Sequence, residues 1–142
     1  MMNPYLHGLL RCIGMFMLML GMSCAFAGVV VIAHPNVHKL DQATVQRIYT
    51  GKVIEVGGVS VAPANVRSGL PLRQRFLNDY LQQTDDAYVA YWTVRRYVGK
   101  GVPPREFATV ADVISFVQAT PGAVAYLDEA DVPSSMNVVL RK

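Results

Sequence analysis

Two hydrophobic patterns follow each other at the start of the globular region. The unbroken apolar run Val29–Ala33 predicts a strand buried on both faces. Pro35 ends it, because proline has no N–H to give to a ladder. Asp41 then suits the cap of a helix whose apolar residues recur at helical spacing as far as Tyr49, with Gly51 as the stop.

Glycine and proline divide the middle of the chain. The segment 52–62 predicts a hairpin that turns at Gly57–Gly58, and its second arm has the stronger strand character. Pro71 suits the first turn of a helix. The stripe on that helix consists of five apolar side chains, Leu72, Phe76, Leu77, Tyr80 and Leu81.

A third helix opens at Thr84 or Asp85 and ends at Gly99. Its predicted buried face consists of Tyr88, Tyr91, Trp92 and Val98. A loop over 101–104 separates it from a fourth helix, which a capping box of Thr109 and Asp112 opens. The inward face of this fourth helix is predicted to hold Val113, Phe116 and Val117.

The chain closes with two strands, Ala123–Leu127 after the break at 120–122, and Asn137–Leu140. The predicted order is therefore β-α-β-α-α-α-β-β. Such an order indicates the α/β class, a small mixed sheet flanked by about four helices.

The composition of the first 27 residues predicts a leader before the globular region. The sequence is 52% hydrophobic, and the uncharged run 12–22 spans 11 residues, too short for the roughly 20 that a membrane helix needs. With Arg11 before it and Ala25-Phe26-Ala27 after it, the run predicts a signal peptide over 1–27 that is cleaved after Ala27. The mature domain is then 28–142, exported to the periplasm and left without a membrane anchor.

Removal of the leader changes charge and cysteine content. Without Arg11 the chain keeps 12 basic and 10 acidic residues, a net charge of +2, too small and too scattered to indicate nucleic-acid binding. Both cysteines, Cys12 and Cys24, lie in the leader, which leaves no disulfide or cysteine metal site in 28–142. Lipidation of Cys24 is an alternative, although Gly21 stands where lipoprotein leaders carry leucine.

Enzyme and metal chemistry find little support. His34, His38 and Asp41 are of the types that zinc uses, but the break at Pro35 favours a solvated loop. Ser68 lies in no Gly-x-Ser-x-Gly elbow. The acidic pairs 85–86 and 128–129 and the basic cluster 95–100 are interpreted as helix-end and solvated charges, with a docking patch as the alternative for the basic cluster. We therefore expect no catalytic residue, no cofactor and no metal.

An anion site is the strongest candidate. In the segment 61–76 a strand runs into a loop with Arg67, Ser68 and Gly69 and then into a helix start, where free backbone N–H groups can hold an anion. Arg67 can add a bidentate contact. An ordinary strand-to-helix connection is the alternative.

A family resemblance extends over most of the mature chain. The segments that carry it are Val45-Gln46-Arg47-Ile48-Tyr49-Thr50-Gly51-Lys52, Arg67-Ser68-Gly69, Arg73 with Phe76, Tyr91-Trp92, Gly99-Lys100-Gly101-Val102-Pro103-Pro104, and Phe116-Val117 with Pro121-Gly122-Ala123-Val124-Ala125-Tyr126. In this order they resemble short, single-domain relatives of the periplasmic phosphate-binding protein of the phosphate ABC transporter, in the type II periplasmic-binding-protein superfamily. The resemblance implies a single periplasmic-binding-protein-like lobe.

The resemblance also implies an oxyanion ligand. Arg67, Ser68 and Gly69 are similar to the family's phosphate-binding turn, and the loop of His34 and Asn36 is similar to a second phosphate loop. The pattern is incomplete: Leu70-Pro71 replace hydroxyl and glycine residues, and the acidic partner of the arginine is missing. We therefore expect both loops at one edge of the sheet, with phosphate or sulfate bound at about millimolar strength.

Two functions follow as hypotheses. The first is a substrate-binding-type domain that takes phosphate or another oxyanion and meets an ABC transporter permease. The second is a non-catalytic interaction module that kept the fold, lost the ligand and docks on an envelope protein or sensor.

Overall fold

The computed structural model describes residues 28–142, so the predicted leader 1–27 lies outside the described residues. In chain order the elements are β1 (Val29–Ala33), α1 (Gln42–Tyr49), β2 (Glu55–Val56), β3 (Val59–Ser60), β4 (Ala62–Val66), α2 (Pro71–Phe76), a π-helical turn (Leu77–Leu81), α3 (Asp85–Tyr97), β5 (Arg105–Phe107), α4 (Val110–Ala119), β6 (Ala123–Asp128), a 3-10 turn (Glu129–Asp131) and β7 (Asn137–Leu140).

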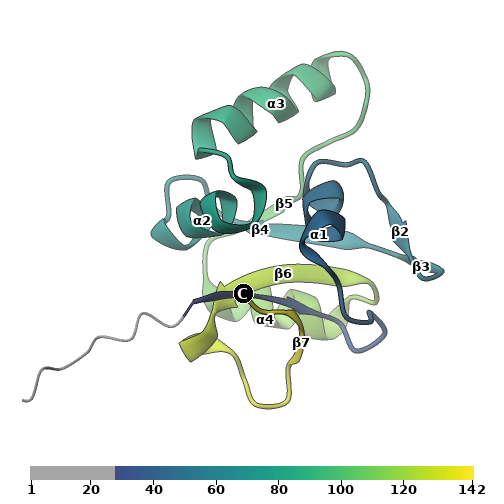
Figure 1. The fold of residues 1–142 in the computed structure, drawn as a ribbon, viewed down its shortest axis with the longest axis vertical. Coiled ribbons are helices and arrows are strands. Elements are labelled where there is room, and N and C mark those ends of the chain that lie inside the picture. Colours follow the sequence, from purple (N-terminus) through teal and green to yellow (C-terminus); the bar gives the residue numbers. More distant parts are fainter. Residues whose placement is uncertain (1–27) are drawn as a thin grey trace, which may run out of the picture.

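Five of the strands form one mixed sheet in the order β5-β4-β6-β1-β7 (Figure 1). β1 runs antiparallel to both neighbours, with Val29 opposite Asp128 on β6 and Ala33 opposite Val124. β4 runs parallel to β6 and to β5. Because β1 lies inside the sheet, all five of its residues are buried, as its unbroken apolar run predicts.

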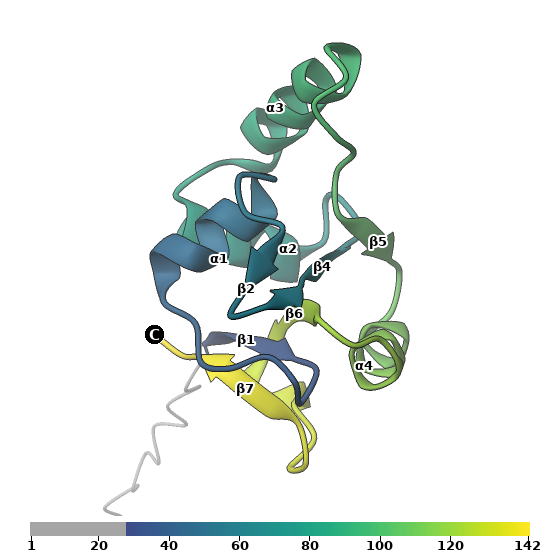
Figure 2. The same ribbon diagram turned by 90° about the vertical axis from the view of Figure 1, so that its right-hand side faces the viewer.

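Helices cover the two faces of the sheet unequally. α1 and α2 lie on one face and α4 on the other, while α3 stands beyond α2 at the edge that β5 forms (Figure 2). Polar side chains start three helices as predicted: Asp41, Thr84 and Thr109 each accept a hydrogen bond from a backbone N–H in the first turn.

An aromatic cluster joins the helices to the sheet. The rings of Phe76 and Tyr126 stack 3.8 Å apart between centroids, and Tyr49 meets Phe76 edge-on at 4.7 Å. The buried hydroxyls all have partners: Tyr49 donates to the carbonyl of Ala64 at 2.8 Å, and Tyr88 donates to that of Tyr49 at 2.9 Å. These hydroxyls of the largely apolar core are therefore satisfied by backbone carbonyls.

The predicted α/β class is confirmed, with corrections at its margins. The hairpin turns at Gly57–Gly58 as predicted, but each arm is two residues long and Ala62 belongs to β4. The predicted order lacks β5, which pairs in parallel with β4. Val98, expected in the core, is 55% exposed, because the end of α3 extends past the sheet.

No helix within 28–142 is both long enough and apolar enough to cross a membrane.

Candidate ligand site at the end of strand β4

The loop predicted to hold an anion leaves the end of β4. Its backbone turns through Gly69, whose φ of +84° lies in the left-handed region, and the N–H of Leu70 donates to the carbonyl of Arg67 at 3.3 Å. The following helix, α2, has Pro71 in its first turn and no side-chain cap. The loop therefore presents few free N–H groups. Its main donors for an anion are the hydroxyl of Ser68 and the backbone N–H of Gly69.

A carboxylate of the chain itself occupies those donors. The Oδ2 of Asp85 accepts from the Oγ of Ser68 at 2.6 Å and from the N–H of Gly69 at 2.9 Å. Its Oδ1 accepts from the Nε of Arg73 at 2.8 Å. Asp85 thus takes the place that an oxyanion was predicted to take. Its interpretation as a helix-end charge alone is wrong.

Arg73 is the buried cation of this cluster, with 2% of its side chain exposed. Its Nη1 donates to Glu106 at 2.5 Å and to the carbonyl of Val66 at 3.2 Å, and its guanidinium lies 5.4 Å from the ring centre of Tyr88. Burial lowers the pKa of Arg73, but its hydrogen bond to Glu106 and the charges of Asp85 and Glu106 outweigh burial and raise that pKa. The guanidinium therefore stays charged in the interior.

The same contacts act on Asp85. Burial raises the pKa of this carboxyl, but the hydrogen bonds from Ser68, Gly69 and Arg73, together with the charge of Arg73, lower it below its ordinary value. At neutral pH the carboxylate is ionised. An anion from solution would have to displace a charge that is already held by three donors.

The second predicted loop lies elsewhere. The N–H of His34 donates to the carbonyl of Ala123, which pairs with Ala62 at the start of β4, whereas Arg67 follows the end of β4. The five residues of β4 lie between the two loops and separate them by about 16 Å along the strand. The expectation of one shared edge is therefore wrong.

Asn36 has a structural contact in its loop. Its Oδ1 lies 2.7 Å from the Nδ1 of His34 and accepts from the N–H of Gly122 at 3.0 Å. The amide of Asn137 donates to the carbonyl of His34 at 3.2 Å. These contacts join the loop to the turn before β6 and to β7.

The remaining candidates are placed as follows. Arg67 is exposed, and its guanidinium makes no hydrogen bond or ion pair within residues 28–142. Arg95, expected on a solvated face, lies half-buried against Tyr91 and Trp92 and donates to the carbonyls of Gly51 and Lys100. No cluster of three metal-ligating side chains exists in the described part of the chain.

Sequence reasoning assigned none of Arg73, Asp85 and Glu106 to this site. One local signal marks Arg73, since it lies three and four residues before Phe76 and Leu77 on the apolar stripe of α2. A charge on a buried stripe needs a partner. Its partners come from α3 and β5, and no local pattern identifies them.

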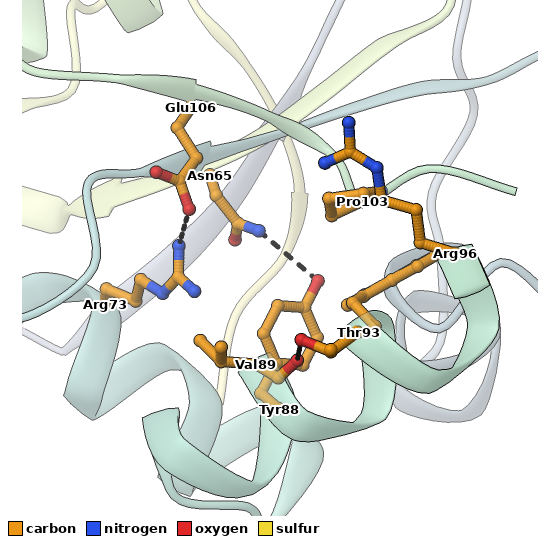
Figure 3. Close-up of a pocket in the computed structure, with 9 residues that line it drawn as sticks. Asn65, Arg73, Tyr88, Val89, Thr93, Arg96, Pro103 and Glu106 are labelled. Atoms are coloured by element: carbon orange, nitrogen blue, oxygen red, sulfur yellow. Dashed lines mark hydrogen bonds and ion pairs between the residues drawn. The ribbon is translucent and has the colours of Figure 1, made fainter.

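A cavity of about 140 Å³ adjoins this cluster, between α3 and the strands β4 and β5 (Figure 3). Arg73 and Glu106 lie on one side of it and Arg96 on the other, while Val89 and Trp92 of α3 line it with apolar surface.

Comparison with known proteins confirms the fold. No protein-family model matches the chain, and no curated protein matches it. Among solved structures it is similar to an ABC-type phosphate transport receptor from Vibrio cholerae, with a TM-score of 0.55 and 14% identity over 79% of this chain and 45% of that one. It is also similar to a protein described as a phosphate ABC transporter substrate-binding protein from Clostridium perfringens, solved with bound phosphate, with a TM-score of 0.55 and 21% identity over 79% and 44%.

The chain therefore spans less than half the length of these two proteins. At such identities the likeness is one of fold, and it bears out the predicted lobe of the phosphate-binding-protein type.

Proposed function

We propose that this chain is an exported, non-catalytic binding module in which the loop expected to bind an oxyanion is closed by its own Asp85. The fold is that of proteins described as phosphate receptors. Recognition of a protein partner, an envelope protein or a transporter permease, then replaces carriage of free phosphate.

One observation carries this proposal: three donors that suit an anion converge on one internal carboxylate. Ser68, Gly69 and Arg73 all bond to Asp85 within 2.9 Å. An incoming anion would have to displace the ionised carboxylate of Asp85 into water. The two negative charges would also repel each other. Among the predicted anion ligands, the exposed Arg67 alone keeps a free charge, and an exposed charge is screened by salt.

Phosphate titration of the mature domain tests this. We expect no saturable binding by the wild type at about 1 mM phosphate, whereas Asp85→Ala, which vacates the loop, gains millimolar binding that weakens with salt. Asp86→Ala removes a neighbouring exposed carboxylate and serves as the matched control, with no gain expected. Tight, salt-insensitive binding by the wild type would favour the substrate-binding hypothesis instead.

Export is the other part of the proposal and has its own test. The leader 1–27 supports secretion to the periplasm and cleavage after Ala27. The intact mass of periplasmic material should then match a chain that starts at Gly28. A retained leader, or a lipid mass on Cys24, would count against this part alone.

A further inference from the structure

The outer face of α3 carries an apolar stripe that is open to solvent. The helix buries Tyr88 and Trp92 against the rest of the domain. On its opposite side four exposed residues recur at the spacing i, i+3, i+7 and i+10, and we call them the α3 stripe: Ala87, Ala90, Val94 and Tyr97. This is the spacing with which one helix packs along another.

The position of α3 leaves room for a second molecule. In both views α3 lies at one end of the longest axis of the described domain, beyond α2 and β5 (Figures 1 and 2). The ring of Tyr97 is 92% exposed, so nothing within residues 28–142 covers it. A partner can therefore reach the α3 stripe without meeting the sheet.

The shape of the α3 stripe selects an orientation for a second α3. The small residues Ala87 and Ala90 occupy its first half, and the larger Val94 and Tyr97 occupy its second half. In an antiparallel pair Ala87 of each copy faces Tyr97 of the other, and Ala90 faces Val94. A parallel pair would set alanine against alanine and leave gaps that close packing does not allow. The stripe is thus complementary to itself when the helices run antiparallel.

The charges of α3 favour the same orientation. Asp86 is an exposed acid in the first turn, and Arg96 is an exposed base in the last turn. Neither side chain makes an ion pair within residues 28–142. Helical spacing puts both on one flank of the α3 stripe. In an antiparallel pair the acidic start of each helix therefore lies beside the basic end of the other, and the helix dipoles oppose each other as well.

We propose that the α3 stripe is a self-association surface, through which two copies of this chain form a symmetric antiparallel dimer. Such a twofold contact uses the same patch on both copies and closes at two subunits. With 13 residues α3 is about 20 Å long, so the contact stays below the roughly 1,600 Å² of a standard interface. We therefore expect a reversible dimer with a dissociation constant of about 100 µM.

Sedimentation equilibrium of the mature protein from about 10 µM to about 1 mM tests the apolar seam. The mass of the wild type should rise with concentration from monomer toward dimer, without larger species. Val94→Asp and Tyr97→Ala should each weaken association by at least about tenfold, because apolar contact at the centre of the seam is lost. Ile54→Asp changes an aliphatic side chain that is 76% exposed outside α3, and it should associate as the wild type does. Thermal melting of each variant verifies that the fold is kept.

An exchange of charges tests the antiparallel orientation. Asp86→Lys and Arg96→Glu each set like charges against each other in a homodimer, and each should weaken association by at least about threefold. A one-to-one mixture of the two variants restores both pairs of opposite charges and should associate more tightly than either variant alone.

A matched mixture separates this effect from net charge. Asp112→Lys changes an exposed acid in the first turn of α4, and Arg47→Glu changes an exposed base in the last turn of α1. These variants have the same net charges as the α3 pair, but their mixture should show no gain over its components.

Three results would overturn the proposed dimer: a wild type that stays monomeric at about 1 mM, wild-type association in Val94→Asp and Tyr97→Ala, or a mixture of Asp86→Lys and Arg96→Glu that gains nothing. The dimer goes beyond the proposed closure of the β4 loop. Phosphate titration reports on that loop and sedimentation reports on α3, so either proposal can fail alone.

Discussion

The Nε of Arg73 lies 2.8 Å from the Oδ1 of Asp85, and this ion pair joins α2 to the first turn of α3. Arg73 is buried, whereas Asp85 keeps 13% of its side chain exposed. Loss of the carboxylate leaves a buried charge with Glu106 as its remaining acidic partner. For a buried pair, such a loss costs about 3 kcal/mol of unfolding free energy.

Stability should depend on pH through Asp85. The pKa of Asp85 is lower in the folded state than its ordinary 3.8, so its contribution is complete above that value and is lost as pH falls through the folded value. We expect the unfolding free energy of the wild type to fall more steeply below about pH 4 than that of Asp85→Asn. Urea unfolding at several pH values measures this, and equal slopes would contradict it.

Trp92 should be a structural residue. It is 5% exposed, and its indole N–H donates to the carbonyl of Tyr49 at 3.2 Å. Trp92→Ala should therefore lower the unfolding free energy by about 3–5 kcal/mol. Tyr97→Ala on the same helix removes a ring that is 92% exposed and should change it by less than about 0.5 kcal/mol. Similar melting of both variants would show that α3 is not fixed by Trp92.

Gly122 should tolerate no side chain. Its φ is +79°, and a Cβ atom there would lie 1.9 Å from the carbonyl oxygen of Ser60. Gly122→Ala should destabilise the domain by more than about 1 kcal/mol, since strain and steric overlap add. Gly57→Ala has similar backbone strain with open space around it, so the difference in unfolding free energy between the two variants isolates the overlap.

The hydroxyl of Tyr126 should contribute to stability. It donates to the Oδ1 of Asn65 at 3.1 Å and accepts from the N–H of Val66 at 3.2 Å. Tyr126→Phe leaves both groups without this partner in the core, at a cost of about 1–3 kcal/mol. Denaturant unfolding against Tyr97→Phe, an exposed hydroxyl, gives the comparison.

Sequence patterns predicted the elements whose signal is local. β1 is an unbroken apolar run because it lies between two strands, and the caps at Asp41, Thr84 and Thr109 act within one turn. β5 escaped prediction because its three residues, Arg105–Phe107, include one apolar side chain and pair with a single neighbour.

The site was predicted in part, and the error has a physical cause. Ligand loops gather at one edge when strands run parallel. β1 runs antiparallel to β6, so its carboxyl end lies opposite the end of β4. The contact of Asp85 with Ser68 depends on α3 folding back across 17 residues, which no local spacing encodes.

The strand order has a consequence for how the chain reaches its fold. β1 is the first strand of the described chain, yet both of its neighbours, β6 and β7, are the last two. Almost the whole sequence must be present before β1 pairs, so the sheet closes through contacts of high sequence separation, which slow folding. Until β6 and β7 are available, the edges of Val29–Ala33 are unpaired. A chain that crosses a membrane unfolded could therefore complete this sheet only after its final strand had crossed.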